Sequence, residues 1–306
     1  MAIVAERCDM TLYPEDRPIP RDRLLKEAVG KAGLLTLLTE RVDEELLDAA
    51  GPSLRVVSNF AVGFDNVDVE ACTRRGVLVT NTPDVLTDAT ADLTWALILA
   101  ASRRVAEGDR MVRSGRPWAW SPDFMLGREV TGKTLGLVGY GRIGQAVAAR
   151  AGPFGMRVVY NSRVPRPDLP GRHHGFEELL EQADVISVHV PLNERTRHMF
   201  GAKEFKAMQP TTVFVNTSRG PVVDETALAE ALETGEIFAA GLDVYEDEPK
   251  VHPRLLALEN VVLAPHLGSA TVETRIAMAV LAAENLVDAL EGREPRAVVN
   301  PQAAGW

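Results

Sequence analysis

The chain has 306 residues, of which 46% are hydrophobic and 25% charged, values ordinary for globular proteins at a length sufficient for two domains. Its formal net charge of −10 argues against a nucleic-acid surface, because phosphate binding needs a clustered positive face. The two cysteines, Cys8 and Cys72, lie far apart in the sequence and form no metal-binding motif. The sequence also has no apolar run of membrane-spanning length and no signal-peptide layout, so we expect a cytoplasmic protein.

Short strands and helices alternate through the first hundred residues, which is typical of an α/β domain. We expect strands near 34–38, 54–58 and 77–80, and helical segments around 21–29, 44–50 and 67–75. An open α/β domain ordinarily begins with a strand and a helix. Here only residues 1–9 precede an extended piece, 10–13, and a proline-rich turn. The first strand–helix unit of this domain is therefore expected to be absent or severely shortened.

A long helical pattern from about 91 to 114 precedes a series of parallel strands with crossover helices. The strands are expected near 134–139, 156–160, 184–189, 212–216, 238–242 and 260–264. Six parallel strands in succession match a doubly wound dinucleotide-binding domain. A second long helical pattern, 272–290, then leads to a short apolar piece, Ala297-Val298-Val299.

This order of elements predicts one domain inserted into another. We expect residues 1–98 and 283–306 to form a discontinuous substrate domain, and residues 99–282 to form a Rossmann cofactor domain. The fold class is α/β, with two doubly wound parallel-sheet domains, of which the first is flavodoxin-like. A small ligand is expected in the cleft between such domains.

A glycine-rich turn follows the first strand of the predicted cofactor domain. Gly139-Tyr140-Gly141-Arg142-Ile143-Gly144 stands between the apolar run 134–138 and a helical pattern that continues through 145–150. Backbone N–H groups in such a turn approach a pyrophosphate at the positive end of the helix. Glycines also serve ordinary tight turns, so the string alone is a weak signal. Its strand–turn–helix context predicts a dinucleotide site.

The next strand ends without an acidic residue. Its end reads Asn161-Ser162-Arg163, where an NAD enzyme usually carries Asp or Glu for the ribose 2′-hydroxyl. An uncharged end followed by Arg163 and Arg166 suits a 2′-phosphate, although both arginines also fit solvated loop charges. We predict NADP(H) as the preferred cofactor, with NAD(H) possible.

Three polar side chains follow later strands, at ends that face the ligand crevice of an open sheet. They are Arg219, Glu248 and His266. A guanidinium fork binds a carboxylate, a histidine donates a proton near neutral pH, and a carboxylate beside a histidine favours imidazolium and fixes its tautomer. Singly, each also fits a surface charge, a solvated acidic loop or a packed histidine. Together, beside a dinucleotide turn, they predict reduction of a 2-keto acid. The other histidines are read as structural or exposed: His173, His174, His189, His198 and His252.

From about Pro18 to Pro295 the chain resembles the D-isomer-specific 2-hydroxyacid dehydrogenase family, most closely its glyoxylate/hydroxypyruvate reductases. The resemblance rests on Val62-Gly63-Phe64-Asp65-Asn66-Val67-Asp68, on Asn81-Thr82-Pro83-Asp84-Val85-Leu86-Thr87-Asp88 and on the three segments just described. It implies that Arg219 binds the substrate carboxylate and orients the carbonyl, that His266 is the acid/base and that Glu248 is its partner. The implied substrate-binding residues are Val62, Gly63, Arg219 and His266.

The resemblance and the turn together imply a set of cofactor-binding residues, with Asp243 beside the nicotinamide. The set is Gly139, Tyr140, Gly141, Arg142, Ile143, Gly144, Asn161, Ser162, Arg163, Val190, Pro191, Thr217, Ser218, Arg219, Asp243, His266 and Gly268. No metal, nucleic acid or membrane is expected.

The expected function is an NADPH-preferring reductase that converts glyoxylate to glycolate and hydroxypyruvate to D-glycerate. Two alternatives stay open: a dehydrogenase of another D-2-hydroxy acid, such as 3-phosphoglycerate or D-lactate, and a non-catalytic, dinucleotide-sensing protein resembling dimeric corepressors. The resemblance also implies a homodimer. The apolar stretch 95–100 fits burial at such an interface or inside one chain, and the Trp-rich loop 115–127 fits a partner-facing surface or local packing of aromatic residues.

Overall fold

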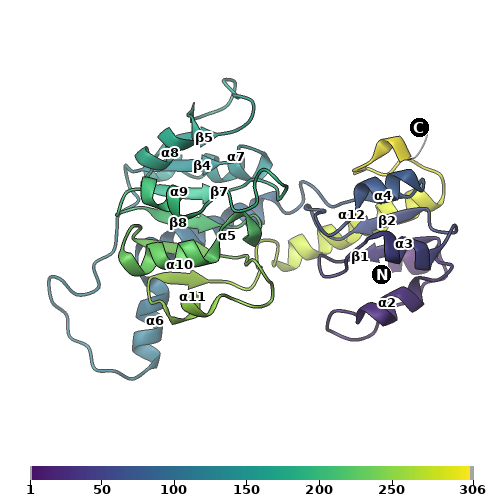
Figure 1. Cartoon of the computed structure of the whole chain (residues 1–306), viewed down its shortest axis with the longest axis horizontal. Coiled ribbons are helices and arrows are strands. Elements are labelled where there is room, and N and C mark those ends of the chain that lie inside the picture. Colours follow the sequence, from purple (N-terminus) through teal and green to yellow (C-terminus); the bar gives the residue numbers. More distant parts are fainter. Residues whose placement is uncertain (1, 304–306) are drawn as a thin grey trace. The chain divides into compact units, whose positions relative to one another are not determined.

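The computed structural model describes residues 2–303 and divides into two compact units, Met1–Leu86 with Thr271–Trp306, and Thr87–Ala270 (Figure 1). The boundaries expected at 98/99 and 282/283 fall inside helices α5 (Thr87–Ser102) and α12 (Val272–Leu290). Helix α5 packs on strands of the second unit, whereas α12 packs on strands of the first. The chain therefore changes unit ahead of each long helix instead of within it.

The second unit is built on a parallel sheet of seven strands in the order β10-β9-β8-β7-β4-β5-β6. The strands are β4 (Thr134–Val138), β5 (Arg157–Asn161), β6 (Arg172–His173), β7 (Val185–Val188), β8 (Val213–Asn216), β9 (Ala239–Leu242) and β10 (Val261–Leu263). The order reverses between β4 and β7, which is the switch point of a doubly wound sheet. The six predicted strands are confirmed. The two-residue strand β6 was not predicted, because so short an edge strand carries no periodicity.

Helices cover both faces of this sheet because successive side chains of a strand point to opposite faces. Leu137 and Val215 pack in one cluster with Trp95 of α5 and Val147 of α7 (Arg142–Ala149). On the other face, Phe214 packs with residues of four helices. These are α8 (Phe176–Gln182), α9 (Ala202–Ala207), α10 (Glu225–Thr234) and α11 (Pro253–Ala257). Two single turns of 3₁₀ helix, η1 (Gly152–Phe154) and η2 (Gly220–Val222), connect strands to helices.

The single helix expected over 91–114 is wrong, because α5 ends at Ser102 and a separate helix, α6 (Val105–Arg113), follows. Arg104 adopts a left-handed conformation, φ 54°, which redirects the chain between the two helices. Its guanidinium pairs with Glu107 at 2.6 Å and so holds the first turn of α6. No residue of α6 is buried, and α6 with the loop after it projects from the sheet (Figure 1).

The first unit contains a parallel sheet of three strands in the order β1-β2-β3. They are β1 (Gly33–Thr36), β2 (Val56–Asn59) and β3 (Leu78–Thr80), and the helices between them are α2 (Arg21–Ala28), α3 (Glu44–Ala50) and α4 (Val69–Arg74). Val57 packs in a cluster with residues of these helices, whereas Val56 packs with Leu286 of α12 on the other face. The apolar tail piece also joins this unit: Val298 bridges Thr80, and the chain then enters η3 (Pro301–Ala303).

The N-terminal segment forms no strand. Residues Ala2–Ala5 form a short helix, α1, whose Val4 is buried against Val56 and Leu286, and residues 10–13 pair with no strand. Among residues 2–303, the sheet of the first unit therefore begins at β1, in line with the predicted shortening. Within the same residues, no helix combines the length and the apolar character that crossing a membrane requires.

Candidate active site

The site residues predicted in the second unit all lie beyond the carboxyl ends of its strands. Gly139–Gly144 follow β4, Asn161–Arg163 end and follow β5, and Val190–Pro191 follow β7. Thr217–Arg219 follow β8, Asp243 follows β9, and His266 and Gly268 follow β10. Because the strands are parallel, these ends share one edge of the sheet. One edge thus carries both the dinucleotide turn and the polar side chains.

The glycine turn has the local geometry that a pyrophosphate site requires. Gly139 has φ +98°, and a Cβ there would lie 2.5 Å from the carbonyl oxygen of His189, since β4 and β7 end side by side. A Cβ on Gly144 would lie 2.4 Å from the Gly139 oxygen, whereas one on Gly141 would meet nothing within 4 Å. The outer glycines permit the tight turn and the close helix packing, and the middle one leaves its backbone open at the start of α7. This is the division of roles expected for a dinucleotide turn.

The end of β5 carries no free carboxylate. The Asn161 amide donates to the His174 carbonyl at 3.0 Å, and the Ser162 hydroxyl donates to the Val164 carbonyl at 2.7 Å. Arg166 forms an ion pair with Asp168 at 3.4 Å. Arg163 is exposed and forms no ion pair with the described residues. Of the two arginines in this loop, Arg163 is the one whose guanidinium has no carboxylate partner.

Glu248 and His266 form a hydrogen-bonded pair. His266 Nδ1 lies 2.8 Å from Glu248 Oε2, and the backbone N–H of Tyr245 donates to Glu248 Oε1 at 3.0 Å. Burial alone would raise the pKa of the Glu248 carboxyl, but the hydrogen bond and charge of His266, with the charge of Arg219, hold that pKa below its usual range. An ionised Glu248 accepts the proton on Nδ1, so Nε2 is the ring atom left to exchange a proton with a ligand.

Asp243 holds the turn that carries His266. Its side chain is 1% exposed, and its two carboxylate oxygens accept the backbone N–H groups of Leu267 and Gly268 at 2.6 and 2.8 Å. Burial raises the pKa of this carboxyl, and the two N–H donors oppose that rise. The structure thus gives Asp243 a positioning role that the sequence did not indicate; its contact with a nicotinamide stays a prediction.

The Arg219 turn is held in a similar way by a residue that the sequence did not single out. Asn216, the last residue of β8, donates from its amide nitrogen to the Arg219 carbonyl at 3.0 Å. Its amide oxygen accepts the backbone N–H and the hydroxyl of Ser218 at 3.0 and 2.8 Å. An asparagine at the end of a buried strand is a signal that would have found it, since such side chains often bond to the turn that follows.

Two threonines of α5 also support this edge of the sheet and were missed. The Thr90 hydroxyl donates to the Gly268 carbonyl at 3.1 Å, and Thr94 and Thr217 share a hydrogen bond of 2.9 Å. Both are buried on a helix predicted only for its apolar character. No local pattern marks them, because their partners lie far away in the sequence.

The remaining predictions concern residues outside this constellation. Val62 and Gly63 belong to the first unit, where their carbonyls accept the amides of Asn81 and Asn59 at 2.8 and 3.0 Å. His189 bonds to the Ser187 hydroxyl at 2.9 Å, and burial lowers its pKa to about 3, so it stays neutral. Within residues 2–303, no group of three or more His, Cys, Asp or Glu side chains is arranged to hold a metal ion.

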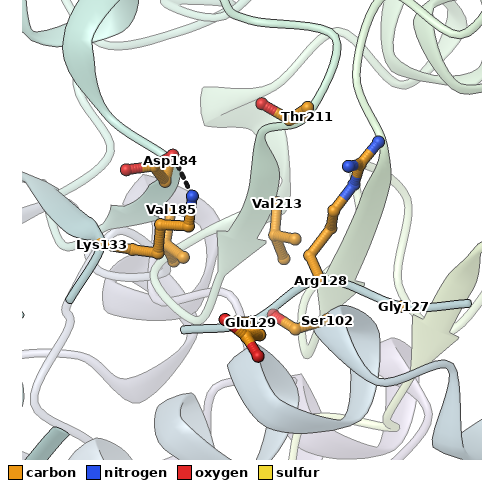
Figure 2. Close-up of a pocket in the computed structure, with 9 residues that line it drawn as sticks. All are labelled: Ser102, Gly127, Arg128, Glu129, Lys133, Asp184, Val185, Thr211 and Val213. Atoms are coloured by element: carbon orange, nitrogen blue, oxygen red, sulfur yellow. Dashed lines mark ion pairs between the residues drawn. The ribbon is translucent and has the colours of Figure 1, made fainter. Parts of the chain in front are cut away.

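A separate pocket of about 270 Å³ opens at the amino ends of β4, β7 and β8 (Figure 2). Lys133 and Asp184 face each other across one side of it at 3.8 Å, and Val213 lies in its middle (Figure 2). It contains none of the predicted site residues. The polar constellation therefore belongs to the opposite, carboxyl edge of the sheet.

Comparison with known proteins gives consistent results. Residues 95–268 match the model of the D-isomer specific 2-hydroxyacid dehydrogenase, NAD binding domain. The chain is 49% identical to a glyoxylate reductase of Thermococcus gammatolerans, over 98% of this chain and 92% of the relative.

Two solved structures are also similar to this chain. A glyoxylate reductase from Paecilomyes thermophila superposes with a TM-score of 0.89 at 35% identity, covering 98% of this chain and 94% of that one. An NADPH-dependent glyoxylate/hydroxypyruvate reductase from Sinorhizobium meliloti, solved with NADP and malonate, gives a TM-score of 0.82 at 38% identity, covering 89% and 85% of the two chains.

The glycine turn yields a paired prediction. Gly139→Ala should lower the free energy of unfolding by more than about 1 kcal/mol, because φ is positive and the added methyl meets the His189 backbone. Gly141→Ala should leave thermal unfolding near that of the wild type, yet raise the Kd for NADPH by occupying the space that a pyrophosphate needs. Circular dichroism and NADPH fluorescence titration measure the two effects. Unimpaired NADPH binding by Gly141→Ala would contradict this account of the turn.

Proposed function

We propose that this chain, which belongs to the family of D-isomer specific 2-hydroxyacid dehydrogenases, is an NADPH-preferring reductase of glyoxylate and hydroxypyruvate. Its relatives already show that it is a reductase of small keto acids. The products would be glycolate and D-glycerate. The observation that carries this proposal is the Glu248–His266 hydrogen bond, which forms within reach of the Arg219 charge at the edge that also holds the dinucleotide turn. The name of the relative from Sinorhizobium meliloti supports the choice of cofactor and substrates.

In this mechanism each of the three side chains has one task. A bound nicotinamide dinucleotide supplies the hydride that reaches the keto carbon. Arg219 binds the substrate carboxylate with its guanidinium fork and polarises the carbonyl. His266 donates the proton from Nε2 to the carbonyl oxygen as that oxygen gains negative charge, and recovers a proton from solvent afterwards.

Glu248 orients the donor. Its ionised carboxylate accepts the Nδ1 proton and so fixes the ring's orientation and its tautomer after the transfer. The backbone amides of Val62 and Gly63 are proposed as further ligands of the substrate carboxylate. We propose that the cofactor contacts residues 139–144, 161–163, 190–191, 217–219, 243, 266 and 268.

The 2′-phosphate is proposed to bind Arg163. This guanidinium is exposed and follows the uncharged end of β5, whereas Arg166 is already paired with Asp168. Arg163 therefore meets a phosphate without first giving up an ion pair. A bidentate contact between a guanidinium and a phosphate also gives geometric specificity.

A homodimer is proposed through α6 and the loop that follows it. Trp118 stacks on Phe124 at 5.9 Å, so local packing accounts for part of this aromatic loop. Trp120 remains 80% exposed, and Val112 of α6 is 63% exposed. Clustered apolar side chains exposed on a projecting segment are typical of a protein–protein contact.

The proposed function and its cofactor preference are tested together by steady-state kinetics. We expect higher kcat/KM with NADPH than with NADH, on both glyoxylate and hydroxypyruvate, in a panel that also contains pyruvate and phosphohydroxypyruvate. Arg163→Ala should reduce the ratio of kcat/KM with NADPH to kcat/KM with NADH by about 10–100-fold. This factor corresponds to the loss of one charge-assisted hydrogen bond, which contributes about 1.5–3 kcal/mol.

Arg166→Ala is the matched control for that experiment, and it should change the preference less because Arg166 is paired with Asp168. Faster turnover of another keto acid would replace the proposed substrates. Stoichiometric NADPH binding without turnover of any keto acid would instead support the corepressor-like alternative.

Loss of the proton donor should separate chemistry from binding. His266→Ala should lower kcat by about 10²–10⁴-fold, because it removes the proposed general acid. NADPH affinity and the circular dichroism spectrum should stay close to those of the wild type. Turnover near the wild-type level in this variant would show that His266 is not the general acid.

If the chain forms a homodimer, sedimentation velocity at low micromolar concentration should give a molecular mass twice that of one chain. Introducing a charge at the proposed contact, as in the double variant Val112→Asp with Trp120→Ser, should yield monomers. Val272→Asp, at a similarly exposed position of the other unit, should leave the sedimentation coefficient unchanged. A wild-type monomer would rule out the proposed interface.

A further inference from the structure

A pair of glutamates outside the proposed catalytic residues ties two segments of the site together. Glu225, the first residue of α10, is 5% exposed, and its Oε1 accepts the backbone N–H of Glu246 at 2.9 Å. In return, Glu246 Oε2 accepts the backbone N–H of Glu225 at 3.0 Å. Each carboxylate thus satisfies the other residue's backbone N–H, and the loop after β9 is joined to the start of α10.

The loop peptide that Glu225 holds is also confined from the other side. Gly220, which directly follows Arg219, lies so close that a Cβ there would be 1.8 Å from the carbonyl carbon of Tyr245 and 2.5 Å from the nitrogen of Glu246. The Tyr245–Glu246 peptide is therefore held between the Arg219 turn and the Glu225 carboxylate. Its position cannot change without disturbing one of the two.

The same loop orients the proposed partner of the proton donor. The N–H of Tyr245 donates to Glu248 Oε1 at 3.0 Å, and Glu248 Oε2 lies 2.8 Å from His266 Nδ1. The Tyr245 hydroxyl donates to the Ala264 carbonyl at 2.9 Å, two residues before His266. A continuous series of contacts thus runs from Glu225 through the loop to the imidazole of His266.

We propose that Glu225 is a positioning residue for the proton donor, holding the 245–248 loop so that the Glu248 carboxylate faces His266. The proposal rests on the proposed function, in which His266 protonates the substrate. Glu225 acts through the backbone N–H of Glu246 and touches no reacting atom. Its task is that of a hydrogen-bond acceptor, which does not require a negative charge.

The surroundings of Glu225 agree with this role. Burial raises the pKa of its carboxyl and the nearby charge of Glu246 raises it further, while hydrogen bonds from the backbone N–H groups of Glu246 and His252 oppose the rise. His198 Nε2 lies 2.5 Å from Glu246 Oε1, the oxygen that does not accept the N–H of Glu225. Glutamine in place of Glu225 keeps one oxygen that can accept the backbone N–H of Glu246, and so should preserve that contact.

Three variants test the proposal. Glu225→Ala removes the acceptor, and should lower kcat for glyoxylate by about 10–100-fold through misplacement of the donor, with a smaller change in KM. Glu225→Gln should restore kcat. Asp224→Ala is the control for a change at the start of the same helix, because it removes the N-terminal cap whose bonds go to Thr226 and Ala227.

The ¹⁵N resonances of the His266 ring give a readout that does not depend on turnover. Glu225→Ala should shift the Nδ1 resonance, because its hydrogen bond to Glu248 weakens, whereas Glu225→Gln and Asp224→Ala should not. An unshifted Nδ1 resonance in Glu225→Ala, or an equal shift of that resonance in Asp224→Ala, would overturn the proposal. Absence of keto-acid turnover in the wild type would instead overturn the proposed function, and the resonances would still decide the role of Glu225.

Discussion

All strands of the dinucleotide-binding unit run in one direction, and this constraint places the whole constellation. Parallel strands need crossover helices, so every strand leaves the sheet at the same edge before the chain turns back. The glycine turn, Arg219, Asp243 and His266 each occupy the first residues after a strand. Residues more than a hundred positions apart thus share one edge because of a backbone rule that involves none of their side chains.

Crowding at that edge dictates where glycine must stand. β4 and β7 end so close together that Gly139 abuts the His189 backbone, and the Arg219 turn passes so near the next loop that Gly220 abuts the Tyr245–Glu246 peptide. A methyl group at either place would collide with backbone, which cannot rotate away as a side chain can. The close approach that leaves no room for a side chain also brings functional segments together.

Carboxylates bonded to backbone N–H groups then fix the loops. Asp243 holds the residues after His266, the Glu225–Glu246 pair holds the loop after β9, and Glu248 is oriented by the N–H of Tyr245. Asp243 and Glu225 are buried, and buried carboxylates are costly unless hydrogen bonds satisfy them, so these two are stable only in the arrangement that they enforce. The proton donor therefore stands on loops whose conformation is specified by charge and hydrogen bonding as well as by packing.

Local patterns in the sequence were sufficient for the strands of the larger sheet and for the glycine turn, and they also led to the proposal of Arg219, Glu248 and His266. These features depend on periodicity and on residues adjacent in the chain. Only the tertiary structure decided the break at Arg104, the edge strand β6, the division of the units ahead of α5 and α12, and the roles of Asp243, Asn216 and Glu225. The short edge strand and the breaks at helix ends are too local to alter a periodic pattern. The positioning roles depend on which backbone groups a side chain meets after folding, and most of those groups belong to distant segments that no local pattern identifies.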